Sequence, residues 1–233
     1  MNTKYRYLIP NGITFLSLIC GIISILLSAN GNFIPAGVLI LASFVLDLFD
    51  GFSARMLKAH SEFGLQLDSL VDMVSLGVAP TVLVFKHIEA ESVAMTLVWP
   101  ASVILALAGA YRLARFNLLP PKKTGSKDSA GLTISSAGAS IALAVLADIV
   151  SPNLIEIPDI AYIPFLLAIS LLMVSRVPFP SFGWVFSNRL RIGLLIILFI
   201  ITIAQYSLFN AWFFWNNMYL GVSLIRAGYK SWQ

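Results

Sequence analysis

The chain has 233 residues, of which 58% are hydrophobic and 11% are charged, and its mean hydropathy is +0.88. Soluble domains carry about 25% charged residues, so this composition excludes an ordinary soluble domain and predicts a protein whose solvent is lipid. The net charge of +4 comes from basic residues scattered between apolar blocks, which excludes a basic stripe for nucleic acid. The single cysteine, Cys20, excludes a disulfide within the chain.

Eight segments of the length and apolar character of membrane helices follow one another along the chain. They centre on residues 10–28, 33–50, 67–86, 95–115, 131–149, 160–176, 190–208 and 211–226. The last two are separated only by a short stretch near Asn210, so six or seven crossings are alternatives. The first segment lacks a small-x-small cleavage site, and we expect a retained helix rather than a signal peptide. The sequence therefore predicts an all-α integral membrane protein, a polytopic helical bundle that forms one domain over residues 1–233.

Basic residues divide unevenly between the two sides of this predicted bundle. With eight crossings, one side collects fourteen basic residues and the other receives only Lys86. The acidic residues of that other side are Glu89, Glu91, Asp148, Glu156 and Asp159. Loops rich in Lys and Arg stay in the cytoplasm, so both termini are expected there. The small residues of 131–140, at the start of the fifth segment, are predicted to pack closely against a neighbouring helix.

Four aspartates mark the most informative stretch of the chain. It reads Asp47-Leu-Phe-Asp50-Gly51-Phe-Ser-Ala54-Arg55 and continues, after eight residues, with Gly64-Leu-Gln-Leu-Asp68-Ser-Leu-Val-Asp72. At about 100° per residue, the first two aspartates share about 100° of arc with Gly51 and Ala54. Asp68 and Asp72 form a second stripe on the next helix. The loop between the helices is short, so the two aspartate pairs are expected to face each other.

Carboxylates clustered inside a membrane predict bound cations. An aspartate near the bilayer centre costs ~2.5–3.5 kcal/mol, and repulsion between like charges adds to that cost. Oxygen ligands select Mg²⁺, Mn²⁺ or Ca²⁺ over Zn²⁺, and the two histidines, His60 and His87, are expected in solvated loops without a role. Two such ions ~3.5–4 Å apart are common in phosphoryl displacement. Ordinary charges at a membrane interface would explain Asp47 and Asp50 alone as well as a metal site does. They explain four aspartates at these spacings poorly.

The remaining residues of this stretch suit a phosphate-bearing substrate. Gly51 and Gly64 have no side chains, so a pyrophosphate group can approach the backbone closely. Arg55 follows one helical turn after Gly51 and is able to bind phosphate oxygens through two parallel hydrogen bonds.

The pattern D-x-x-D-G-x-x-A-R, followed after eight residues by G-x-x-x-D-x-x-x-D, resembles the signature of the CDP-alcohol phosphotransferases. This resemblance implies a six-helix core, an active site facing the cytoplasm at the membrane boundary, and a homodimer. It implies two divalent cations bound by Asp47, Asp50, Asp68 and Asp72, with Asp72 as the general base. The residues that it implies for binding the CDP-lipid are Asn11, Thr14, Gly51, Ala54, Arg55, Ser61 and Gly64.

Three further stretches resemble bacterial and archaeal phosphatidylserine synthases: Ile9–Thr14, Tyr111–Asn117 and Met173–Phe182. The resemblance implies transfer from CDP-diacylglycerol to L-serine, giving phosphatidylserine and CMP, in the plasma membrane of a prokaryote. Arg112, Arg115 and Asn117 are candidates for binding serine, although anchoring of the membrane boundary and helix capping are alternatives. One departure is Gly131-Leu-Thr-Ile-Ser135, where the family reads close to Gly-Leu-Pro-Ile-Pro, so the start of this helix is expected to differ.

Two other functions compete with transfer to serine. The nearest is the same chemistry with another alcohol, such as glycerol 3-phosphate or inositol. The other is a divalent-cation or proton-coupled transporter, because buried aspartates also mark ion pathways. A transporter has no need for the phosphate-binding residues Gly51 and Arg55.

Overall fold

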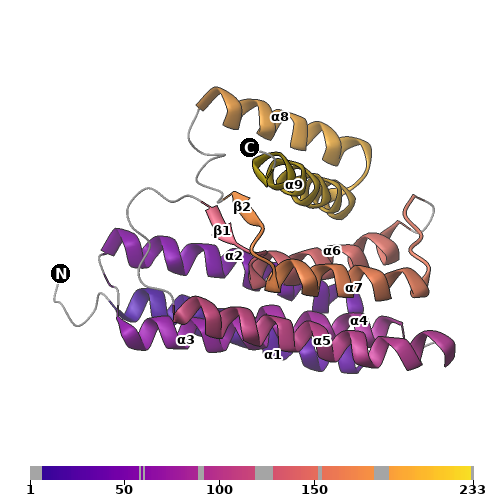
Figure 1. The fold of residues 1–233 in the computed structure, drawn as a ribbon, viewed down its shortest axis with the longest axis horizontal. Helices are drawn as coiled ribbons and strands as arrows, with labels where there is room; N and C mark the ends of the chain where they lie inside the picture. The colour runs from indigo at the N-terminus through magenta and orange to yellow at the C-terminus, as the bar shows by residue number, and fades with distance from the viewer. Residues whose placement is uncertain are drawn as a thin grey trace.

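The computed structural model describes residues 7–57, 59, 61–88, 92–118, 128–151, 154–180 and 189–231. Within these residues the chain folds into eight helical rods (Figure 1). Seven of them are the single helices α1 (Leu8–Ala29), α2 (Phe33–Leu57), α5 (Ser92–Asn117), α6 (Ile134–Val150), α7 (Asp159–Val174), α8 (Arg189–Gln205) and α9 (Leu208–Ser231). The other rod, the third in the chain, joins α3 (Glu62–Asp72), the π-helical segment η2 (Met73–Val78) and α4 (Ala79–His87).

Four of these rods are long and apolar enough to span a membrane: Leu8–Ala29, Phe33–Leu57, Glu62–His87 and Thr96–Asn117. Shorter apolar helices cover Ile134–Val150, Asp159–Val174 and Gly193–Gln205. Large apolar side chains lie exposed along several helices, as a bundle surrounded by lipid requires. The prediction of an all-α, multi-pass membrane protein is confirmed. The number of crossings stays a prediction.

Helices α2 and α3 extend beyond the apolar segments that predicted them. The apolar segments centre on 33–50 and 67–86, and α2 continues to Leu57 while α3 begins at Glu62. Hydropathy identifies only the part of a helix that contacts lipid. The residue at which the helix starts is determined instead by its capping residue. Ser61 is that cap, because its side chain accepts a hydrogen bond from the Gly64 backbone N–H at 3.0 Å. The aspartates therefore lie within regular helix rather than at frayed ends.

Helix α6 lies among the other helices, and its small residues allow their close approach. Thirteen of its seventeen residues are buried. A Cβ atom on Gly138 would overlap the backbone carbonyl oxygen of Leu76 in η2. On α2, a Cβ atom on Gly37 would lie 2.8 Å from Cγ of Leu146 in α6. The predicted close packing of this small-residue segment is confirmed.

Helices α8 and α9 lie together on one side of the remaining bundle (Figure 1), where α9 packs against α6. The sequence did not predict a short antiparallel pair of strands, β1 (Asp128–Ala130) and β2 (Pro178–Pro180). Pairs of three residues carry little sequence signal, and two prolines in β2 argue against a strand on propensity alone. The pair connects the segments that precede α6 and follow α7.

The expectation that His87 is a solvated loop residue is wrong. His87 is the last residue of α4, its side chain is only 15% exposed, and its Nε2 lies 2.9 Å from Oδ2 of Asp148 on α6. Tyr162 on α7 donates a hydrogen bond to the same carboxylate oxygen at 3.0 Å. This cluster joins three helices by satisfied polar contacts. His60 lies outside the described residues.

Candidate active site

Aspartates of α2 and α3 meet in one cluster, as their helical spacing predicted. Carboxylate oxygens of Asp47, Asp50 and Asp68 all lie within 4.8 Å of one another. The fourth, Asp72, is 7% exposed, and its carboxyl group lies close enough to that of Asp47 to interact with it electrostatically. Each of the two neighbouring helices thus contributes a pair of carboxylates to a single site.

Side chains of two other helices lie beside the carboxylates of α2. The Thr14 hydroxyl on α1 lies 2.9 Å from Oδ2 of Asp50, to which it donates a hydrogen bond. Ser135, in the first turn of α6, is a polar neighbour of Asp47. The surroundings of the aspartate cluster therefore include α1 and α6 as well as its own two helices.

The helix geometry changes directly after Asp72, where η2 begins. Short π-helical segments are rare and are frequent at functional sites. The Ser75 hydroxyl in η2 donates a hydrogen bond to the backbone carbonyl of Ser17 on α1 at 3.0 Å. A Cβ atom on Gly21 would overlap Ser75, so α1 approaches this segment closely. These contacts place the end of the aspartate stripe against α1.

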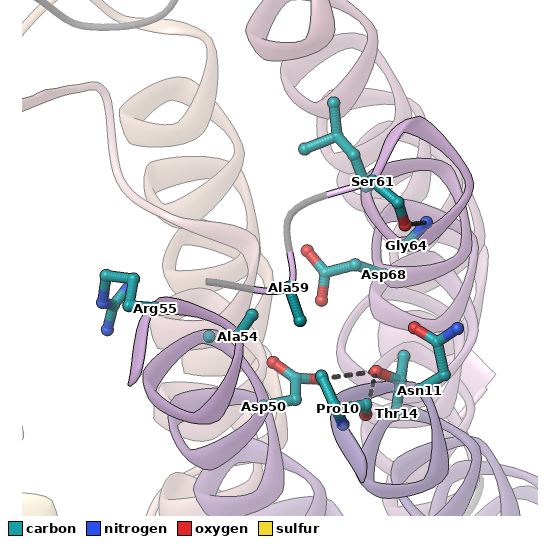
Figure 2. Close-up of a pocket in the computed structure, with 12 residues that line it drawn as sticks. Pro10, Asn11, Thr14, Asp50, Ala54, Arg55, Ala59, Ser61, Gly64 and Asp68 are labelled. Atoms are coloured by element: carbon teal, nitrogen blue, oxygen red, sulfur yellow. Dashed lines mark hydrogen bonds between the residues drawn. The ribbon is translucent and has the colours of Figure 1, made fainter. Parts of the chain in front are cut away.

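A pocket of about 180 Å³ opens beside the cluster (Figure 2). The Asp50 and Asp68 side chains extend into it from different helices, with Ala59 of the connecting segment between them (Figure 2). All seven residues predicted to bind the CDP-lipid line this pocket, namely Asn11, Thr14, Gly51, Ala54, Arg55, Ser61 and Gly64. The structure thus brings together residues from α1, α2 and the start of α3.

The two glycines of the motif are in different surroundings. A Cβ atom on Gly64 would lie 3.1 Å from the Ser61 hydroxyl oxygen and 3.4 Å from Oδ1 of Asn11, so a side chain there would crowd the pocket wall. A Cβ atom on Gly51 would lie 3.5 Å from Nη1 of Arg55 and meet no other residue. The exposed Arg55 side chain therefore lies near Gly51. Figure 2 shows it at the edge of the pocket, on the side away from Asp68.

Of the three residues predicted to bind serine, Arg112 lies next to the aspartates. Its side chain is 7% exposed and interacts electrostatically with Asp72, Asp47 and Asp68. Its guanidinium carbon also lies 5.4 Å from the centre of the Phe116 ring. Its Nε has no hydrogen-bond partner among the described residues. A buried guanidinium with unused hydrogen-bonding capacity is suited to an anionic ligand.

Arg115 and Asn117 are bound to other parts of the protein. Arg115 donates from Nη1 to the Val174 carbonyl oxygen at 2.8 Å and from Nη2 to that of Ala130 at 3.0 Å. Asn117 donates from Nδ2 to the Ser69 hydroxyl at 3.0 Å, which links α5 to α3. These contacts hold the scaffold around the site. Binding of serine by either residue stays a prediction.

The cluster has the chemistry of a divalent-cation site. Its ligand atoms are carboxylate oxygens, which suit Mg²⁺, Mn²⁺ and Ca²⁺. Asp47 and Asp72 interact electrostatically, and neighbouring carboxylates repel each other unless a cation neutralises them. Arg112 supplies one positive charge beside three of the four carboxylates, so the residues present fit bound cations.

Sequence reasoning missed four residues of this site. Pro10, Ala59 and Leu65 line the pocket, and Ser135 is a polar neighbour of Asp47. Pro10 lies in the stretch Ile9–Thr14, Ala59 lies between the two halves of the aspartate motif and Leu65 lies within the second half, so their position in the chain was an available signal. Ser135 is far from Asp47 in the chain, and its only signal was the departure from the family's proline at that position.

Comparisons with known proteins agree with this geometry. The sequence profile of the CDP-alcohol phosphatidyltransferase family matches residues 7–223. The CDP-diacylglycerol–serine O-phosphatidyltransferase of Helicobacter pylori (strain 26695) is 32% identical over 197 residues, which cover 83% of this chain and 80% of the relative. That of Bacillus subtilis (strain 168) is 33% identical over 178 residues, 75% of this chain and 90% of the relative.

An archaeal relative extends the comparison. The archaetidylserine synthase of Methanothermobacter thermautotrophicus is 32% identical over 175 residues, which cover 74% of this chain and 69% of the relative. The profile match spans nearly the whole chain, including the aspartate motif and the helices that surround it. The chain therefore belongs to the CDP-alcohol phosphatidyltransferase family.

Proposed function

We propose that this protein transfers the phosphatidyl group of CDP-diacylglycerol to the hydroxyl of L-serine, with phosphatidylserine and CMP as products. The observation that carries the proposal is the convergence of four aspartates of α2 and α3 beside a pocket lined by every residue expected to bind the CDP-lipid. Relatives named serine phosphatidyltransferases and an archaetidylserine synthase support serine as the acceptor.

Asp47, Asp50, Asp68 and Asp72 would hold two divalent cations, Mg²⁺ or Mn²⁺, with Ca²⁺ as a further candidate. Bound cations supply positive charge that neutralises the pyrophosphate of the donor lipid and the charge that develops during transfer. The Thr14 hydroxyl holds Asp50 at the wall of the pocket, and the Ser61 hydroxyl shapes the opposite wall through Gly64. Arg55 reaches phosphate oxygens from the edge of the pocket.

The acceptor side of the site would be formed by Arg112 and Asp72. Arg112 binds the serine carboxylate through its unused hydrogen-bond donor, which is buried beside the aspartates. Asp72 accepts the proton of the serine hydroxyl while the serine oxygen forms its bond to the lipid-bearing phosphorus. The bond from that phosphorus to the CMP oxygen breaks, and CMP leaves with the electron pair. Arg115 and Asn117 fix the end of α5, on which Arg112 lies.

The proposal includes an orientation in the membrane. Fourteen of the fifteen Lys and Arg residues fall on the side of the aspartate motif when the chain crosses eight times. We place both termini and the site on the cytoplasmic face of a prokaryotic plasma membrane for this reason. A homodimer and a single catalytic domain over residues 1–233 remain predictions, and native mass spectrometry in detergent tests the first of them.

Acceptor profiling tests the proposed function. Purified protein in detergent receives CDP-diacylglycerol and Mn²⁺ with serine, glycerol 3-phosphate or inositol, and CMP release is measured. We expect release that depends on serine and stops when the metal is chelated. Release with another alcohol alone would support the proposed transfer reaction but rule out serine as the acceptor. Metal flux into vesicles without CMP release would instead favour a transporter.

A further inference from the structure

Three buried serines, Ser17 on α1, Ser43 on α2 and Ser75 in η2, form a hydrogen-bonded layer between three helical rods. The hydroxyl oxygens of Ser17 and Ser43 lie 2.6 Å apart. The Ser75 hydroxyl donates to the Ser17 carbonyl oxygen at 3.0 Å. A hydroxyl buried among apolar helices is unfavourable unless it is hydrogen-bonded, and each of these hydroxyls has a partner within the layer. The serine layer therefore joins the three rods at fixed points.

The serine layer adjoins the aspartate site along the chain. Its members are three or four residues away from Thr14, Asp47 and Asp72, which is about one helical turn. On each rod the serine lies on the far side of these residues from the segments that line the pocket. A change in the serine layer is thus transmitted to the site through less than two turns of helix.

Ser75 lies in the joint between the aspartate-bearing helix and the rest of its rod. Helix α3, with Asp68 and Asp72, forms one end of this rod, and α4 forms the other end (Figure 1) and packs against α1 and α6. At the end of η2 the Ala79 backbone N–H donates to the carbonyl of Val74, five residues earlier. A π-helical turn holds more residues than an α-helical one, so the winding of η2 determines the direction in which the aspartates of α3 face relative to α4.

Close packing from two sides holds η2 in this winding. A Cβ atom on Gly21 of α1 would lie 2.6 Å from Cα of Ser75, and one on Gly138 of α6 would lie 3.1 Å from Cα of Leu76. Side chains tilt towards the N-terminal end of a helix, so a larger residue at position 21 would cover the carbonyl of Ser17, four residues earlier. The missing side chain leaves this carbonyl open to the Ser75 hydroxyl.

We propose that Ser75 is a positioning residue whose hydroxyl holds η2 against α1 and thereby directs Asp68 and Asp72 towards the aspartates of α2. The proposal rests on the proposed function, in which all four aspartates bind metal. Loss of the hydroxyl lets η2 rewind towards α-helical geometry, which turns the aspartates of α3 away from those of α2. The affinity for metal then falls by about tenfold, the lower end of the range for residues that support metal ligands.

The chain contains a matched control for this hydrogen bond. Ser24 of α1 is also fully buried, and its hydroxyl donates to the Ala36 carbonyl oxygen on α2 at 2.9 Å. The bond is of the same kind, from a serine to a backbone carbonyl on another helix, but Ser24 lies ten residues beyond Thr14 and outside the serine layer. Ser24→Ala and Ser75→Ala therefore lose equivalent contacts at different distances from the aspartates.

Direct Mn²⁺ binding tests the role of Ser75 without relying on turnover. Full-length protein in detergent is titrated with Mn²⁺, and free Mn²⁺ is followed by its electron paramagnetic resonance signal. The kcat and KM for CMP release and the melting temperature are measured on the same samples. Ser75→Cys is a second variant, because it keeps a side chain of similar size and replaces the hydroxyl with a weak donor.

We expect about tenfold weaker Mn²⁺ binding in Ser75→Ala, a smaller weakening in Ser75→Cys and wild-type affinity in Ser24→Ala. The kcat should fall by about tenfold or more in Ser75→Ala, because small displacements of reacting groups are costly, while the KM for CDP-diacylglycerol changes little. Melting temperatures should fall by similar small amounts in Ser75→Ala and Ser24→Ala, since each loses one hydrogen bond between helices.

Two results would overturn the positioning role. One is equal Mn²⁺ affinity and kcat for wild type and Ser75→Ala. The other is an equal loss of Mn²⁺ affinity in Ser24→Ala, which would attribute the effect to general loosening of the bundle. Failure of the wild-type protein itself to bind Mn²⁺ would overturn the proposed metal chemistry instead.

Discussion

The hydroxyl oxygen of Thr14 lies 2.9 Å from Oδ2 of Asp50 and 3.0 Å from the carbonyl oxygen of Pro10. A hydroxyl has one hydrogen, so the two acceptors share it. Thr14 thereby connects the first turns of α1 to the aspartate motif of α2 (Figure 2). The first helix therefore contributes residues to the pocket wall and is not only a membrane anchor.

Removal of the Thr14 hydroxyl should weaken metal use. We expect Thr14→Val, which keeps the shape of the side chain, to raise the Mn²⁺ concentration needed for half-maximal CMP release by about tenfold. Thr14→Ser keeps the hydroxyl and should stay close to wild type. The metal dependence of CMP release measures the effect, and identical curves for Thr14→Val and wild type would refute the role of this hydrogen bond.

Asp72→Asn should abolish turnover while CDP-diacylglycerol still binds. A positioned general base contributes about 10²–10⁴-fold to rate, and the amide of asparagine does not accept the serine proton. Initial rates measure turnover, and the rise in melting temperature with added CDP-diacylglycerol measures binding. Asp159→Asn is the control, because Asp159 lies in the first turn of α7 and outside the cluster. Near-normal turnover of Asp72→Asn would show that another group removes the proton.

Arg112→Lys should affect serine more than the lipid donor. Lysine keeps the positive charge beside the aspartates but loses the planar donor geometry that binds a carboxylate through two hydrogen bonds. We expect the KM for serine to rise about tenfold or more and the KM for CDP-diacylglycerol to change little. Steady-state kinetics with each substrate varied in turn measures both constants. An equal rise in both would place Arg112 outside the acceptor site.

Gly138→Ala should destabilise the protein by separating α6 from η2. The added Cβ would overlap the Leu76 carbonyl oxygen, a backbone atom that cannot move aside cheaply. Overpacking of this kind costs about 1–3 kcal/mol and should lower the melting temperature. Gly221→Ala on α9 is the matched control, because a Cβ there meets no other atom within 4 Å. Equal melting temperatures for the two variants would contradict the packing described for α6.

The aspartate pairs could be predicted from local periodicity, whereas the residues that line the pocket were predicted from the resemblance to the CDP-alcohol phosphotransferases. Asp68 and Asp72 are one helical turn apart, and the short connection from α2 requires the two helices to be neighbours. Ser135 and His87 depend instead on partners that are far away in the chain. Asp148, the partner of His87, is 61 residues distant and lies on another helix. Single-sequence patterns contain no information on such pairs.

Helix boundaries depend on contacts that apolar content does not record. The apolar segments centred on 33–50 and 67–86, and Ser61 caps α3 while Ala59 bonds back to the Ala54 carbonyl at 2.9 Å, which extends regular structure on both sides of the connection. Hydropathy measures the contact with lipid and not the hydrogen bonds that start or end a helix. The departure from the family pattern at Thr133 was visible in the sequence, and the structure shows that this residue caps α6.

Phosphatidyl transfer to serine is tested most directly by measuring the incorporation of labelled serine into lipid. Purified protein is incubated with CDP-diacylglycerol, isotope-labelled serine and Mn²⁺, and labelled lipid and CMP are quantified together by mass spectrometry. We expect labelled phosphatidylserine and CMP in equal amounts. Both products should be absent after chelation of the metal and in the Asp68→Asn variant. Folded protein that forms no labelled lipid with Mn²⁺ or Mg²⁺, or that forms it equally well after chelation, would contradict transfer to serine by the aspartate cluster.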